Sequence, residues 1–60
     1  MELFYIYYDL PDLKMRKILS DYKHGIYEIS CGDGKIAFFD QDVFESAKEH
    51  LDELSIEYSE

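Results

Sequence analysis

The stretch ELFYIYYD, residues Glu2 to Asp9, is rich in aromatic side chains, includes the β-branched Ile6 and holds no glycine or proline. Such residues fit a pleated surface, so the stretch predicts a strand. Alternation divides its apolar side chains between two faces, with Leu3, Tyr5 and Tyr7 on one and Phe4, Ile6 and Tyr8 on the other. A strand that is apolar on both faces is typically central in its sheet, and we expect the rest of the chain to build on either side of it.

The segment after this strand predicts a helix over about residues 11–23. Pro11 suits the first helical turn, and Asp12 suits the positive end of the helix dipole. The buried stripe follows the i, i+3, i+4, i+7 spacing and consists of Met15, Ile18, Leu19 and Tyr22. Gly25 follows cationic residues and is expected to end the helix.

The second half of the chain predicts a hairpin, a helix and a short last strand. Residues 26–30 and 35–39 flank Cys31-Gly32-Asp33-Gly34, a turn sequence that supplies positive φ angles. A helix is expected over about 42–54, with Asp40 or Asp42 as its cap. Its apolar face is expected to contain Val43, Phe44, Ala47, Leu51 and Leu54. Residues 55–59 alternate polar and apolar, as a strand does.

The resulting order, β-α-β-β-α-β over residues 1–60 as one domain, resembles the ferredoxin-like plait. That α+β fold has a four-stranded antiparallel sheet, here in the expected order 4-1-3-2, with two helices on one face. If the last segment is not a strand, the fallback is βααβ or βαββα with a three-stranded sheet. The resemblance is one of fold, and this fold carries many unrelated functions.

Composition limits the kind of partner. The formal net charge is −8, which argues against direct binding to nucleic acid or to an anionic membrane and favours a basic protein. A single cysteine rules out an intrachain disulfide and suits a cytoplasmic setting, in the host cell if the protein is viral. The two histidines and the cysteine lack the spacing of a zinc site, so we expect no metal and no cofactor. A chain of 60 residues has a small core, which favours self-association.

Charge is unevenly distributed along the chain. Residues 14–23 carry four cations and one carboxylate, whereas residues 40–60 carry eight carboxylates and only Lys48. The carboxylates expected to bind a basic partner are Asp42, Glu45, Glu49, Asp52, Glu53 and Glu57. Their clustering costs helix stability, because like charges at i, i+4 repel by about 0.2–0.5 kcal/mol per pair. The competing interpretation is a solvated face that keeps the protein soluble.

The sheet face without helices predicts a second interface. We expect Leu3, Tyr5 and Tyr7 there, because tyrosine hydroxyls tolerate water. Phe38 or Phe39 of the third strand would lie beside them, and we select Phe39 for this interface. A homodimer or another protein contact is the first interpretation of this face. An RNA-stacking platform is the second, although the third strand lacks the basic-Gly-aromatic motif of such domains and the net charge is unfavourable. In the third, the aromatics are core residues and the face assignment is shifted by one.

No recognisable catalytic motif is present. The Gly-Asp-Gly loop lacks the Lys-Ser/Thr ending of a phosphate loop, and helix capping explains Asp40 and Asp42 more simply than calcium binding. We therefore expect a non-enzymatic acidic protein-binding module. It would be a phage or mobile-element inhibitor that docks on the basic surface of a nucleic-acid-binding or defence protein, as a DNA mimic does. The alternative is a small dimerising regulatory or assembly module of the host cell.

Overall fold

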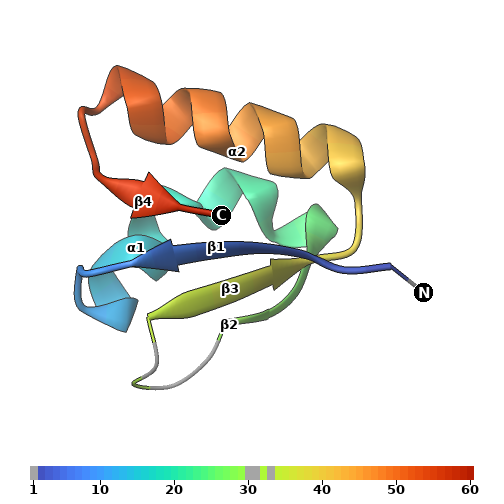
Figure 1. Cartoon of the computed structure of the whole chain (residues 1–60), viewed down its shortest axis with the longest axis horizontal. Coiled ribbons are helices and arrows are strands. Elements are labelled where there is room, and N and C mark those ends of the chain that lie inside the picture. Colours follow the sequence, from blue (N-terminus) through green and yellow to red (C-terminus); the bar gives the residue numbers. More distant parts are fainter. Residues whose placement is uncertain (1, 30–31, 33) are drawn as a thin grey trace.

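The computed structural model describes residues 2–29, 32 and 34–60 (Figure 1). In chain order, its elements are β1 (Phe4–Tyr8), α1 (Asp12–Ile18), the 3₁₀ helix η1 (Ser20–Gly25), β2 (Ile26–Ile29), β3 (Lys35–Phe38), α2 (Gln41–Glu53) and β4 (Tyr58–Ser59). Among the described residues, no helix has the length and apolar character needed to cross a membrane.

The strands form a four-stranded sheet in the order β2-β3-β1-β4, which is β4-β1-β3-β2 when read from the other edge. Every neighbouring pair is antiparallel. The α+β class and the antiparallel four-stranded sheet are therefore confirmed, and the three-stranded fallback is wrong. β1 lies between β3 and β4, as its two apolar faces predict.

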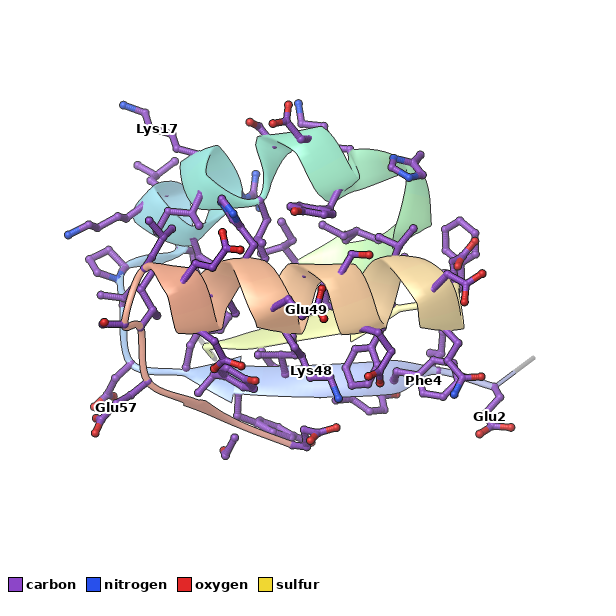
Figure 2. All side chains as sticks on the ribbon, turned by 90° about the horizontal axis from the view of Figure 1, so that it is seen from above. Glu2, Phe4, Lys17, Lys48, Glu49 and Glu57 are labelled. Atoms are coloured by element: carbon purple, nitrogen blue, oxygen red, sulfur yellow. The ribbon has the colours of Figure 1, made fainter. Side chains whose placement is uncertain are left out.

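The core lies between one face of the sheet and the helices. Ile6 and Tyr8 of β1 point into it, and the register places Ile36 of β3 directly opposite Ile6. The buried helix residues that pack on this face are Met15, Leu19, Val43, Phe44, Ala47 and Leu51. Seen from above, α1 and η1 lie beside α2 (Figure 2). The opposite face of the sheet carries Tyr5 and Tyr7, so the favoured assignment of the two faces of β1 is confirmed.

The first helix is shorter than expected. α1 ends at Ile18, and the residues that follow form η1, so a continuous helix over 11–23 is wrong. A Cβ at Gly25 would collide with the side chain of Val43 on α2, and the Gly25 carbonyl accepts a hydrogen bond from the Phe39 N–H at 3.0 Å. A 3₁₀ helix rises about 2.0 Å per residue instead of about 1.5 Å. We infer that this contact with α2 sets the path of η1.

The second helix is capped at both ends by the residues that flank it. The Asp40 side chain accepts a hydrogen bond from the Val43 N–H at 3.2 Å, so Asp40 is the cap and the alternative cap, Asp42, is wrong. At the other end, Ser55 has a φ of 57°, and the Ile56 N–H bonds to the Leu51 carbonyl at 3.0 Å. This is a Schellman ending, in which glycine is the usual residue at the Ser55 position.

The Schellman ending explains two further differences. Leu54 stands at the helix end and is 50% exposed, not buried as expected. Ser55 and Ile56 reverse the chain, which shortens β4 to Tyr58–Ser59 from the expected 55–59.

The β2–β3 hairpin has positive φ angles at Gly32 (87°) and Gly34 (63°), as its sequence predicts. The expected turn residues Cys31 and Asp33, and Ser30 before them, lie outside the described residues.

Candidate functional site: two protein-interaction surfaces

The outward side of α2 is acidic along its whole length. Five carboxylates lie on it and all are exposed: Asp42, Glu45, Glu49, Asp52 and Glu53. Val43, Ala47 and Leu51 face the core, so the 3.6-residue period turns these five residues away from the sheet. In Figure 2, α2 is seen from this side, with Glu49 near its middle. We call these five residues the acidic face. The structure thus brings five of the six predicted partner-binding carboxylates together.

Glu57 does not join the acidic face. It is exposed on the segment between α2 and β4, beyond the end of the helix (Figure 2). The Schellman ending at Ser55 carries the chain back toward the sheet before Glu57, so its carboxylate is separated from the outward side of α2. The expected six-residue strip is therefore a five-residue face with Glu57 apart from it.

Lys48 lies at the border of the acidic face. Its Nζ atom is 3.0 Å from Glu45 Oε1 and 3.1 Å from Glu60 Oε1, and it lies 4.5 Å from the centroid of the Phe44 ring. Hydrogen bonds to Glu45 first and Glu60 second raise the pKa of the Lys48 ammonium. The Lys48 side chain is only 16% exposed, so its charge is directed along the side of α2 and not outward.

Apart from Glu45, the carboxylates of the acidic face form no ion pair with a described cationic side chain. Within the described part of the chain, the only ion pairs are those of Lys48 with Glu45 and Glu60. Asp52 accepts a hydrogen bond from the Tyr58 hydroxyl at 3.4 Å. Asp42, Glu49 and Glu53 therefore present their charge to solvent without a described cationic partner.

The uncovered face of the sheet carries aromatic residues of β1 and its neighbours. The Tyr5 and Tyr7 rings stack with centroids 6.4 Å apart, and the Lys35 Nζ lies 5.3 Å from the Tyr5 centroid. Ala37 lies directly opposite Tyr5 in the register and is only 6% exposed. The two stacked tyrosines and the Lys35 stem beside Tyr5 give this face a partly apolar surface.

The four residues predicted for this second interface differ in position and exposure. Tyr5 and Tyr7 are exposed on β1, Phe39 is exposed directly after β3, and Leu3, directly before β1, is half-buried. We call Leu3, Tyr5, Tyr7 and Phe39 the open face. Tyr27 of β2 is a further exposed aromatic residue, and it was not among the residues predicted from the sequence for an interface. The register of β2 shifts between Ile26 and Glu28, and strand alternation does not anticipate such an irregularity.

Asp12 holds three parts of the chain together. Its Oδ1 accepts a hydrogen bond from the Tyr8 hydroxyl at 2.6 Å, and its Oδ2 accepts one from the Gly32 N–H. The hydrogen bond from Tyr8 lowers the pKa of the Asp12 carboxyl most, and the hydrogen bond from Gly32 lowers it further. Burial raises the pKa of the Tyr8 hydroxyl most, and its hydrogen bond to Asp12 raises it further. This arrangement joins β1, α1 and the hairpin, and we assign it a structural role.

Residues 2–29, 32 and 34–60 contain no group of three or more His, Cys, Asp or Glu side chains arranged to hold a metal ion. No protein-family model, curated protein or solved structure matches the chain.

Proposed function

We propose that this protein is a non-enzymatic protein-binding module whose acidic face docks on a basic surface of a partner protein. The observation that carries the proposal is the arrangement of α2. Its outward side carries five exposed carboxylates, and the one lysine of the helix is held at the border by Glu45 and Glu60. Complementary charge mainly accelerates association and suppresses binding to wrong partners.

The charge density of the acidic face favours a partner that normally binds nucleic acid. Asp42 and Glu53 are separated by eleven helical steps of about 1.5 Å, or roughly 16 Å. Five carboxylates over this length give about one charge per 3–4 Å, close to the roughly 3.4 Å of one strand of B-DNA. Bound to a phosphate-binding surface, the module would exclude nucleic acid and act as an inhibitor. A phage or mobile-element origin would suit this role.

We propose that the fold is a ferredoxin-like plait, because the strand order and the packing of both helices on one face of the sheet support it. In that arrangement the acidic face and the open face lie on opposite sides of the molecule and could be occupied together. We place this activity in the cytoplasm, where a single cysteine can remain reduced.

The experiment is affinity capture from cell lysate with quantitative mass spectrometry. The parent is compared with a Glu49→Lys/Glu53→Lys variant and with an Asp9→Lys/Asp21→Lys control. All four residues are exposed, and both variants change the net charge equally. We expect the parent and the control to recover basic nucleic-acid-binding proteins that added duplex DNA releases. We expect the Glu49/Glu53 variant to lose them. Equal recovery by all three proteins would show that the acidic face is only a solvated surface.

A second candidate function is that of a dimerising regulatory or assembly module, and the open face favours it. Glu28 of β2 and Lys35 of β3 lie on this side of the sheet with opposite charges, so two copies related by a two-fold axis could pair them reciprocally. A domain of this size also gains stability by self-association.

Sedimentation at micromolar concentration tests this second candidate. We expect a species with the mass of two chains, and we expect Tyr7→Lys to convert it to monomer. Tyr7 is exposed on the open face, so this change should spare the fold. A parent protein that sediments as a monomer throughout would exclude self-association through this face.

A further inference from the structure

A predominantly apolar groove of about 370 Å³ runs between the first helical segment and β2. Leu13, Leu19, Ile26 and Ile29 contribute its apolar lining. Leu13 is 76% exposed, which makes it the most exposed large apolar side chain described. A leucine this exposed beside an apolar groove is a natural anchor point for another chain.

The groove borders an open edge of the sheet. β2 is the last strand in the order β2-β3-β1-β4, and within the described residues no strand pairs with its outer edge. An edge strand presents unpaired backbone N–H and C=O groups, which are a template for strand addition. A peptide that added a strand here would place alternate side chains toward the apolar lining.

The charge around the groove is opposite to the charge of the protein as a whole. Arg16, Lys17 and Lys23 line the groove, whereas the chain has a net charge of −8. Figure 2 shows Lys17 extending from α1 away from α2. Three cations around an apolar floor complement a segment that carries both carboxylates and apolar side chains.

We propose that the groove between α1, η1 and β2 binds an acidic, extended peptide segment of another protein, which adds as a strand to the free edge of β2. This surface is separate from the acidic face of α2, so the inference goes beyond the function proposed above. Each of the two can fail without affecting the other.

The observations favour this occupant over two others. Two copies pairing symmetrically through β2 would bring Arg16, Lys17 and Lys23 of each chain toward the same residues of the other, and like charges oppose such a contact. A single-stranded nucleic acid would need aromatic stacking platforms, and no described aromatic residue lines this groove.

The test begins with a displayed library of short random peptides, selected on the whole protein at low salt. We expect enrichment of sequences that alternate acidic and apolar residues. Binding of one selected peptide is then measured by fluorescence anisotropy for the parent, for Lys17→Glu/Lys23→Glu and for Lys14→Glu/Lys48→Glu. The last variant is the control for net charge, because it makes the same charge change away from the groove lining. It also breaks the two ion pairs of Lys48, so its folding is checked together with that of the groove variant.

We expect the Lys17/Lys23 variant to bind about tenfold or more weakly, since reversal of charges beside a bound carboxylate turns attraction into repulsion. The control should stay within about twofold, because it leaves the groove unchanged. Methylation of alternate peptide backbone nitrogens, in the register that faces β2, should abolish binding by removing the ladder hydrogen bonds.

The proposal would be overturned by the absence of an enriched motif, by enrichment of basic peptides, or by equal weakening by both variants. Full binding by both of two peptides, each methylated in one of the two alternate registers, would overturn it as well. Loss of folding is checked by circular dichroism. If Lys17→Glu/Lys23→Glu unfolds, Lys17→Gln/Lys23→Gln takes its place, with Lys14→Gln/Lys48→Gln as control. A selected peptide that was displaced by single-stranded RNA more readily than by its own unlabelled form would point to nucleic acid as the occupant.

Discussion

Replacing Glu49 with lysine should make the isolated protein more stable. Glu49 is exposed near the middle of α2, one helical turn from both Glu45 and Glu53. It takes part in neither ion pair of the described residues, so its removal breaks no such contact. The substitution therefore isolates the cost of clustering negative charge on one helix face.

The magnitude follows from the neighbours of position 49. Each like-charge pair at i, i+3 or i, i+4 destabilises a helix by about 0.2–0.5 kcal/mol, and each opposite pair stabilises it by a similar amount. A lysine at position 49 replaces three repulsions, with Glu45, Asp52 and Glu53, by three attractions, which together amount to about 1–3 kcal/mol. Glu45 is already bound to Lys48 at 3.0 Å, so we expect the lower end of this range. For a domain of this size, about 1 kcal/mol raises Tm by about 4–8 °C.

Thermal unfolding followed by circular dichroism measures this effect at low salt and at about 1 M salt, where the screening length is about 3 Å. Glu49→Gln removes only the repulsions and should give about half the shift. Glu57→Lys makes the same net charge change away from the acidic face and serves as the control. The reasoning is refuted if Glu49→Lys leaves Tm unchanged at low salt, if Glu57→Lys matches its shift, or if salt does not diminish it.

Four further substitutions test local features of the fold. Ser55→Gly should raise the free energy of unfolding by about 0.5 kcal/mol in denaturant titrations. Glycine removes the strain of a left-handed backbone conformation at this position, and the greater conformational freedom of the unfolded chain offsets part of that gain. A decrease would contradict the Schellman assignment. Gly34→Ala should cost about 2 kcal/mol or more, because its Cβ would meet the Tyr8 carbonyl oxygen at a φ of 63°. Gly32→Ala, with a positive φ but open space, should cost clearly less, and equal losses would argue against that contact. The pKa of the Asp12 carboxyl is lowered, so its contribution to stability is full at neutral pH and is lost as the pH falls through the folded-state pKa, below the ordinary value of 3.8. Asp12→Asn should remove this part of the loss of stability in acid. An unchanged dependence of stability on pH would show that Tyr8 and Gly32 do not bind the carboxylate.

The sequence predicted the sheet well because strand alternation is a local property. The apolar side chains of β1 fill both of its faces, so β1 had to be central, and the tyrosines could be assigned to the open face from their hydroxyls. The acidic face followed from the 3.6-residue period of α2 in the same way. Both surfaces depend on a regular repeat along a single element.

The features that the sequence missed depend on contacts between elements. The change from α1 to η1 accompanies the packing of Gly25 against Val43, which are eighteen positions apart. The choice of Asp40 over Asp42 as cap depends on where α2 begins, and boundaries are the least determined part of a periodic pattern. The groove was missed because its lining comes from two helical segments and a strand. Leu13 was its one local signal, an apolar residue outside the buried stripe and beside basic residues.

The cost of the acidic face matters because this domain is small. At about 0.05–0.15 kcal/mol per residue, a chain of 60 residues has a total stability of about 3–9 kcal/mol. Four like-charge pairs at i, i+3 or i, i+4 spacing on α2 remove about 1–2 kcal/mol of it. A basic partner would reverse this effect, since binding to the folded state adds about 2.7 kcal/mol at a concentration 100 times Kd. Glu49→Lys should then be the more stable protein when alone and the less stable one when the partner is present. A face kept only for solubility would not show that reversal.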